Sequence, residues 1–135
     1  MIDDHDKVIS FFRFEDLRVY HKALDYASWV QERAAGFFEK DKGLVSSRFC
    51  HAAQSIALNI AEGSARNKRQ FVYYLKVSKS AIRDCLVFTS MVHQLQYFTD
   101  EDEHYSRNQL MELTKMLGAL IGSLQKAGGF EDDLD

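Results

Sequence analysis

The sequence predicts an all-α protein, an antiparallel up-down-up-down, left-handed bundle of four helices. Four segments repeat apolar residues at steps of three and four, which is the spacing of one face of an α-helix. The chain contains no proline and only seven glycines, so little in it interrupts long helices. The connections between the segments are short, which favours antiparallel neighbours that bury their apolar faces against one another.

The first helix is expected to begin near Glu15 and to end around residues 40–43. Glu15 and Asp16 would then stand in its first turn, where carboxylates suit the positive end of the helix dipole. Its expected apolar face consists of Leu17, Tyr20, Leu24, Ala27, Val30, Ala34 and Phe37.

The second helix is expected to end at Gly63, because glycine accepts the left-handed conformation that often closes a helix. Its expected apolar face consists of Leu44, Phe49, Ala52, Ala53, Ile56 and Ile60. The third helix is expected to open at Asn67, an N-cap residue followed three positions later by Gln70. Its expected apolar face consists of Phe71, Leu75, Ser78, Ile82, Cys85, Phe88 or Thr89, Val92 and Leu95.

The fourth helix is expected to open at Thr99, with Asp102 in the reciprocal position of a capping box, and to end at the glycine pair 128–129. Its apolar face repeats leucine at steps of three and four: Leu110, Leu113, Leu117, Leu120 and Leu124. The chain therefore divides into a flexible N-terminal segment (1–13), the bundle (14–128) and an acidic C-terminal tail (129–135).

The charges of the chain are segregated along its length. The net formal charge is −3, yet from Leu17 to Thr99 there are 12 Lys and Arg residues against 6 Asp and Glu residues, a net of +6. The segregation bears on the partners of the protein and not on its fold. No apolar run approaches the roughly 20 residues that cross a bilayer, and the acidic N-terminus differs from a signal peptide. We therefore expect a cytoplasmic protein that does not enter membranes.

Catalytic and metal-binding patterns are not found in the sequence. The five histidines form no pair at metal-ligand spacing, and Cys50 and Cys85 form no CxxC unit. Glu62 is the one acid within an apolar helical stretch, and it has no partner acid or base nearby in the sequence. We predict no enzymatic activity, no cofactor, no metal and no small-molecule substrate.

A basic face on the third helix is the strongest functional signal. Arg69, Lys76 and Arg83 are seven residues apart and share one side of the helix, and this side would run roughly 25 Å from Arg66 at 1.5 Å per residue. Its length suits several phosphates, and an aromatic ring within it could stack on a base. The alternative is an ordinary solvated helix face. The predicted nucleic-acid-binding residues are Arg66, Lys68, Arg69, Tyr73, Lys76, Lys79 and Arg83.

A polar stripe on the second helix, which consists of Arg48, Ser55, Asn59 and Glu62, is open to two interpretations, and Ser55, Asn59 and Glu62 are its predicted structural contacts. It is either a solvent-exposed face or a set of structural polar contacts between helices. In the second case Asn59 and Glu62 would hydrogen-bond across to the third helix, at Ser78, Ser80 or Arg83, because a buried carboxylate needs a partner.

Several large apolar residues are left over once the four inner faces are assigned. They are Trp29, Phe38, Val72, Tyr74, Val87, Met91 and Met116. They indicate either a wide core or a second apolar surface that is used for self-association.

Three stretches of the sequence resemble one known family. "FEDLRVYHKAL" (14–24) is similar to its opening, "SIALNIAEGSAR" (55–66) to its central signature, and "QFVYYLKVSKSAIRDC" (70–85) to its third-helix pattern. Over residues 14–126 the chain resembles the four-helix-bundle proteins encoded within intervening sequences of bacterial 23S rRNA genes. The accessory variability protein of diversity-generating retroelements is related to them.

The resemblance implies a ring-shaped homopentamer without catalytic activity. It also implies that RNA or a nucleic-acid-processing protein is a partner, because the retroelement relatives bind nucleic acid and a reverse transcriptase through a basic surface. We therefore expect a self-assembling bundle associated with RNA or a ribonucleoprotein. The alternative is a protein–protein adaptor with no nucleic-acid role.

Overall fold

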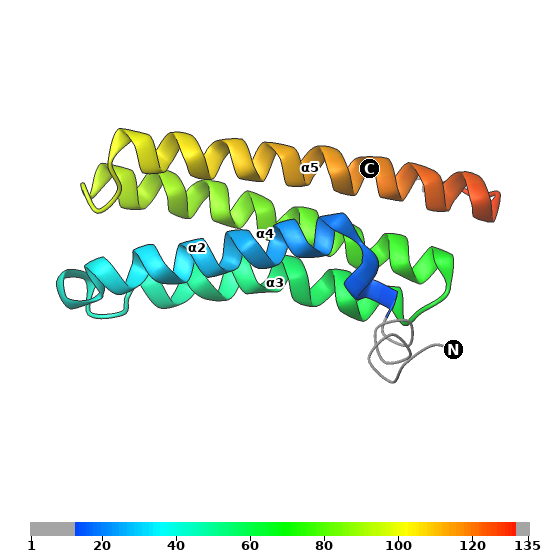
Figure 1. The fold of residues 1–135 in the computed structure, drawn as a ribbon, viewed down its shortest axis with the longest axis horizontal. Coiled ribbons are helices and arrows are strands. Elements are labelled where there is room, and N and C mark those ends of the chain that lie inside the picture. The colour runs from blue at the N-terminus through cyan, green and yellow to red at the C-terminus, as the bar shows by residue number, and fades with distance from the viewer. Residues whose placement is uncertain (1–12, 132–135) are drawn as a thin grey trace, which may run out of the picture.

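The structure, a computed structural model, describes residues 13–131 and consists of helices. A short 3₁₀ helix, η1 (Arg13–Asp16), precedes four long α-helices: α2 (Arg18–Asp41), α3 (Ser46–Ser64), α4 (Lys68–Gln94) and α5 (Asp100–Gly128). The prediction of an all-α chain with four helices is confirmed. Consecutive helices run back and forth along the long axis of the molecule (Figure 1). Most of the predicted N-terminal segment, residues 1–12, and the end of the predicted tail, residues 132–135, lie outside the described residues.

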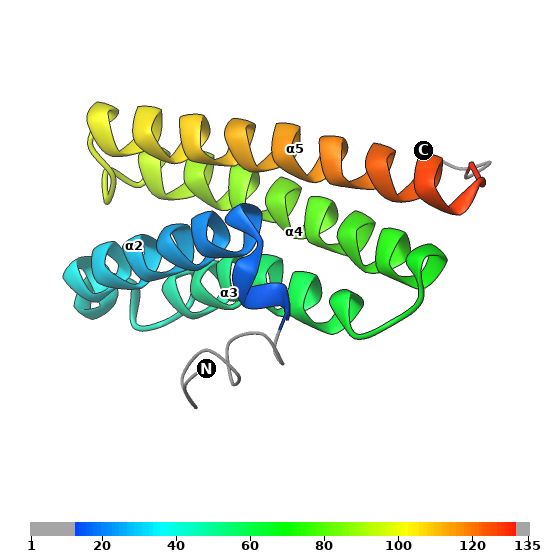
Figure 2. The same cartoon turned by 45° about the vertical axis from the view of Figure 1, so that its right-hand side comes forward.

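The four helices enclose one hydrophobic core. Each helix packs on the next, and α2 also packs on α5, so the core lies along the axis between all four (Figures 1 and 2). Its largest fully buried side chains are Tyr26, Phe49, Ile56, Ile60, Leu75, Ile82, Leu110, Leu113 and Leu117. None of the described helices is both long and apolar enough to span a bilayer. The left-handed sense of the bundle stays a prediction.

Some positions of the predicted apolar faces are wrong. Leu24, Leu44 and Leu95 are exposed, Leu44 to 76%, whereas Val72 is fully buried. Leu44 lies in the turn between α2 and α3 and Leu95 follows the last residue of α4, so neither stands on the inner face of a helix. Val72 stands on the side of α4 next to its predicted stripe, which shows that the buried face is wider than a single row.

The start of the first long helix also differs from the prediction. Arg13, Glu15 and Asp16 belong to η1, and Leu17 adopts an extended conformation before α2 begins at Arg18. The imidazole Nε2 of His21 contacts the carbonyl oxygen of Glu15, which fixes η1 against the first turn of α2. The two carboxylates therefore precede the helix and do not stand in its first turn.

A buried hydroxyl cluster connects three helices. The Tyr26 hydroxyl on α2 lies 2.8 Å from the Ser106 hydroxyl on α5, which lies 2.8 Å from the Thr89 hydroxyl on α4. Thr89 donates to the carbonyl oxygen of Cys85. Burial raises the pKa of Tyr26 well above its ordinary value of 10, so the phenol stays neutral. Since a buried hydroxyl without a partner is costly, the cluster favours one axial alignment of α2, α4 and α5.

The α2–α3 corner is organised by the buried carboxylate of Asp41. Lys42 and Gly43 both take positive φ, 55° and 78°, and turn the chain back. Asp41 then accepts hydrogen bonds from the backbone N–H groups of Val45 and Ser46 and from the Ser46 hydroxyl. The last residue of α2 therefore caps the N-terminus of α3.

The structure of the α3–α4 corner shows that the role predicted for Gly63 is wrong. Gly63 is helical and buried, α3 continues to Ser64, and the residue after it is Ala65, with negative φ. A Cβ on Gly63 would stand 2.7 Å from the Tyr74 Cβ and 2.8 Å from the Phe71 Cδ1. Gly63 therefore allows close approach of α3 and α4 and does not provide a left-handed end.

The other predicted helix ends are confirmed. The Asn67 side chain accepts from the backbone N–H of Gln70, and Thr99 and Asp102 form a complete capping box. Gly129 closes α5 with a φ of 66°. At the α4–α5 corner the two ring nitrogens of His93 lie 2.7 Å from Asp100 and 3.2 Å from Glu103, which connects the end of α4 to the first turn of α5.

Candidate nucleic-acid interface

The seven predicted nucleic-acid-binding residues lie on the first two-thirds of α4 and on the turn that precedes it. Most are exposed, and Lys76 and Lys79 are half-buried. Arg69, Lys76 and Arg83 are spaced by seven residues, so about 21 Å separates the first from the last. These three residues are called the basic row below. The surface around them is cationic over a length that matches several phosphates of one strand.

Arg66, at the start of this surface, is held in place by two contacts. It donates to the carboxylate of Glu62 one turn earlier, and its guanidinium lies 5.4 Å from the centre of the Tyr74 ring. The hydrogen bond to Glu62 raises the pKa of Arg66 above its already high value. Because Glu62 offsets its charge, Arg66 contributes less to the cationic surface than the sequence indicated.

Aromatic rings accompany the cations. The Arg69 guanidinium lies 4.5 Å from the centre of the Phe130 ring, which the end of α5 brings to the first turn of α4. Tyr73 is 63% exposed and contacts Tyr74 edge to face. An exposed ring beside a cationic row is the arrangement on which unpaired bases stack. The Phe130 contact does not follow from the pattern of the sequence, since 61 residues separate its partners.

The polar residues predicted on α3 bond to residues of α3 itself and of the turn that follows it. The Asn59 amide donates to the carbonyl and hydroxyl oxygens of Ser55, and Glu62 pairs with Arg66. The prediction that Asn59 and Glu62 reach Ser78, Ser80 or Arg83 is wrong. Glu62 is exposed and needs no buried partner. The cross-helix bond runs from the Ser78 hydroxyl to the carbonyl oxygen of Ile56.

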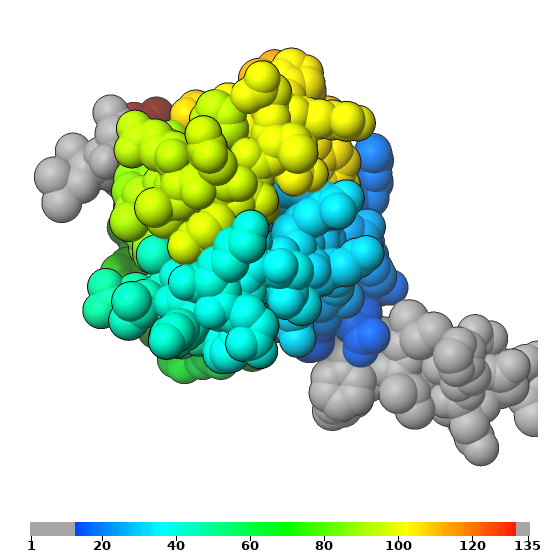
Figure 3. Space-filling view, turned by 90° about the vertical axis from the view of Figure 1, so that its left-hand side faces the viewer, coloured from blue at the N-terminus to red at the C-terminus, as the bar shows by residue number. Residues whose placement is uncertain are grey.

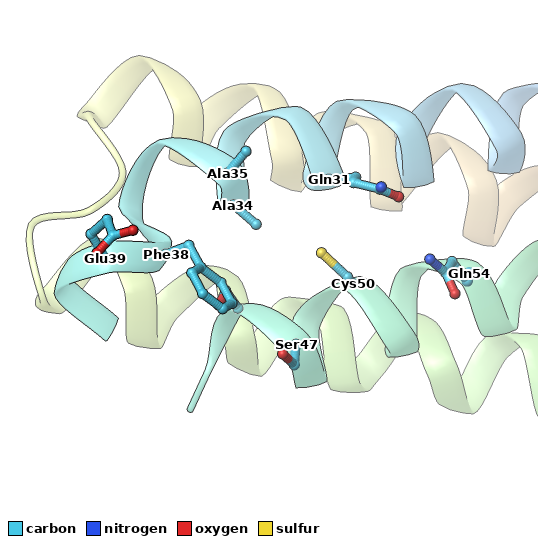
Figure 4. A pocket seen from close by; sticks show the side chains of 9 residues that line it. Gln31, Ala34, Ala35, Phe38, Glu39, Ser47, Cys50 and Gln54 are labelled. Atoms are coloured by element: carbon cyan, nitrogen blue, oxygen red, sulfur yellow. The ribbon is translucent and has the colours of Figure 1, made fainter. Parts of the chain in front are cut away.

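A groove of about 480 Å³ lies between α2 and α3 (Figure 4). Its walls are mostly small or apolar, with Phe38 at one end and Gln31 and Gln54 at the other, and the Cys50 thiol points into it. Among residues 13–131 no three His, Cys, Asp or Glu side chains gather as metal ligands, in this groove or elsewhere. The groove presents a contact surface and no recognisable acid–base pair.

The two cysteines are free thiols in different surroundings, and this predicts different reactivities. Burial raises the pKa of Cys85 to about 12 and raises the pKa of the half-buried Cys50 by a smaller amount. We expect a thiol-specific reagent at pH 8 to modify one cysteine per native chain and two after denaturation in urea. The Cys50→Ser variant should show no reaction while folded. Rapid native modification of that variant would contradict the buried position of Cys85.

Comparison with known protein families assigns the chain to one of them. The model of a protein family described as 23S rRNA-intervening sequence protein matches residues 15–119. No curated protein is similar enough to the chain to be matched. The matched residues include η1 from Glu15, α2, α3, α4 and most of α5, and therefore the entire basic row.

Proposed function

This chain belongs to the family of 23S rRNA-intervening sequence proteins, and we propose that it is a self-associating, non-catalytic bundle that binds RNA through α4. The family is not a known enzyme family. The observation that supports RNA binding is the cationic surface of α4, with Arg69, Lys76 and Arg83 in one row and Tyr73 exposed beside it. Cations neutralise phosphates while the tyrosine ring stacks on a base, so single-stranded RNA fits this surface best.

Part of the acidic charge behind the net −3 lies away from the basic row. Four consecutive acids, residues 100–103, lie at the start of α5, at the end of the bundle where α4 stops (Figure 1). At physiological ionic strength, charges separated by more than about 8 Å in solvent are largely screened from each other. A phosphate chain on the basic row is therefore largely screened from residues 100–103. The described acids near the first turn of α4 are Glu62, which pairs with Arg66, and Glu131, which follows Phe130.

Reversing the basic row is expected to weaken RNA binding at least tenfold. The triple variant R69E/K76E/R83E removes three phosphate contacts, so the slope of log K against log salt should fall by roughly 2. Fluorescence anisotropy with a labelled 20-nucleotide single strand, at several salt concentrations, measures both quantities. K40E/K42E/R48E is the matched control, since it changes the charge by the same amount at the α2–α3 corner. Equal affinity of the wild type and the triple variant would refute the proposed surface.

Self-association is proposed from the apolar side chains that the single chain leaves exposed. Phe38, Leu58, Tyr73, Val87 and Met91 are each at least 40% exposed. The expected ring of five copies, each of 15.6 kDa, has a mass of about 78 kDa, which light scattering distinguishes from that of a monomer.

The groove between α2 and α3 also suits a protein partner, so an adaptor role is the second candidate if no RNA binds. Two free thiols accord with the reducing cytoplasm as the proposed location.

A further inference from the structure

The chain beyond α5 is fixed against the start of α4. After α5 the chain turns back at Gly129, which has a φ of 66°, and the backbone N–H of Phe130 donates to the carbonyl oxygen of Gln125 at 3.1 Å. The Phe130 ring packs partly buried against the core, and its centre lies 4.5 Å from the Arg69 guanidinium. The end of α5 and the start of α4 lie at the same end of the bundle (Figures 1 and 2).

A close contact between the Phe130 ring and the α5 backbone defines where this ring lies. A Cβ on Gly128 would stand 2.5 Å and 2.7 Å from two carbon atoms of the Phe130 ring, so the ring occupies the space that a side chain at Gly128 would fill. The same point lies 3.6 Å from the Cδ of Lys68. Phe130 is therefore held between the last turn of α5 and two basic residues, Lys68 and Arg69, in the first turn of α4.

The residues that follow Phe130 are almost all acidic. Glu131 is exposed, and residues 131–135 carry four carboxylates, which are called the tail acids below: Glu131, Asp132, Asp133 and Asp135. Five residues extend at most about 17 Å at ~3.3–3.6 Å per residue, which is less than the roughly 21 Å of helix from Arg69 to Arg83. The tail acids therefore start beside Arg69 and reach the first part of the basic row.

Attachment to Phe130 makes the tail acids a strong competitor for these cations. A group on a short tether meets a neighbouring surface at an effective concentration on the order of millimolar. A contact with a dissociation constant in that same range would then occupy the cations for about half of the time. Carboxylates and phosphates are both anions that pair with Lys and Arg, so each excludes the other from the same side chains.

We propose that the tail acids cover Lys68 and Arg69 and have to leave before RNA binds at the start of α4. The tail is thus a built-in competitor that lowers the affinity of the surface for RNA. The inference rests on the proposed RNA binding and adds the regulation of that same site. Because the contact of the tail with the cations is itself screened by salt, its effect on RNA binding is largest at low ionic strength.

Neutralising the tail in the full chain tests this competition. E131Q/D132N/D133N/D135N keeps the length of the tail and is expected to bind a labelled 20-nucleotide single strand at least threefold more tightly than the wild type at 50 mM salt. The gain should shrink as salt is added. Fluorescence anisotropy measures the affinities, and circular dichroism checks that the variants are folded.

A matched control removes the same number of charges elsewhere. D25N/E32Q/E39Q/E101Q neutralises four exposed acids, three on α2 and one in the first turn of α5. Figure 3 shows the opposite end of the bundle, where α2 ends and α5 begins. This control should change the affinity for RNA less than twofold. A gain equal to that of the tail variant would overturn the inference, since net charge alone would then explain it.

A second measurement detects the tail contact without RNA. A water-soluble carbodiimide joins a carboxylate and an amine that touch, so it should link Lys68 to one of the tail acids, and mass spectrometry of the digested chain identifies the link. Lys68→Arg keeps the charge, removes the amine and should lose the link. Single-stranded RNA should suppress the link in the wild type. A wild type without this link would overturn the contact.

The outcomes separate the tail from the proposed function. RNA binding of equal affinity by the wild type and the tail variant overturns the competition and leaves RNA binding by α4 in place. RNA that binds without suppressing the Lys68 link overturns it too. Absence of RNA binding by the wild type and the tail variant alike, at low salt, refutes the proposed function and with it the competition.

Discussion

Replacing Gly63 with alanine is expected to destabilise the folded chain by ~2 kcal/mol, although alanine is the better helix former. Gly63 lies in the last turn of α3 and is buried against the first turns of α4. The added Cβ would stand 2.7 Å from the Tyr74 Cβ, and real Cβ atoms do not approach that closely. The Tyr74 Cβ is attached directly to the backbone, so α4 would have to move away from α3 to relieve the overlap.

Two opposing effects decide whether Gly63→Ala raises or lowers the stability of the folded chain. Alanine gains up to ~1 kcal/mol over glycine inside a helix, whereas overpacking a tight contact costs ~1–3 kcal/mol. At Gly63 the overlap involves two residues, Phe71 and Tyr74, so the cost exceeds the gain. Gly63→Val, which adds two more carbons at the same place, should be worse.

Urea unfolding followed by circular dichroism measures the effect, with Gly118→Ala as the matched control. Gly118 also lies within a helix, α5, but a Cβ there meets nothing within 4 Å. The control should therefore stabilise the chain by up to ~1 kcal/mol through helix propensity alone. A Gly63→Ala variant as stable as Gly118→Ala would show that α3 and α4 are not in close contact at this corner.

The helix ends that are made by hydrogen bonds between neighbouring residues could be predicted from the sequence. Asn67 and Thr99 cap their helices as expected, because an N-cap bond joins residues only three positions apart. The role of Gly63 could not be predicted in this way. A glycine near the end of an apolar run has two physical uses, a left-handed end or a close approach, and only the position of the next helix distinguishes them.

The candidate site shows the same division between local and distant information. The shared side of Arg69, Lys76 and Arg83 follows from the helix period alone, and the structure has these residues on one helix as expected. The partners that modify the surface did not follow from the sequence. Phe130 reaches Arg69 only because α5 returns along α4. Glu62 pairs with Arg66 and not with a residue of α4, because the chain turns just after Gly63.

The α2–α3 corner offers the second large effect, which depends on a buried charge. Asp41 is the last residue of α2, where the negative end of the helix dipole opposes a carboxylate, but it faces the N-terminus of α3, where the dipole favours one. Its two oxygens accept two backbone N–H bonds of 2.8 Å and one hydroxyl bond. Hydrogen bonds to a buried charged group stabilise by ~1.5–3 kcal/mol, more than bonds between neutral groups.

Asp41→Ala is therefore expected to destabilise the chain by ~3 kcal/mol at pH 7, because it leaves the N–H groups of Val45 and Ser46 without their acceptor. The change alters no residue of the basic row, so a loss of stability can be measured apart from binding. Unfolding in urea gives the value. Asp84→Asn, at an exposed carboxylate on α4, should change the stability by less than ~0.5 kcal/mol.

The contribution of Asp41 should also depend on pH in a defined direction. Burial alone would raise its pKa, but the hydrogen bonds from Ser46, Val45 and Gly43 outweigh burial and lower the pKa below the ordinary 3.8. A carboxylate with a depressed folded pKa contributes fully above its unfolded pKa and loses its contribution as the pH falls through the folded one. The difference between wild type and Asp41→Asn should therefore be constant from pH 7 to about 5 and shrink below about pH 4. A difference that persists unchanged at pH 3 would mean that the charge of Asp41 does not cap α3.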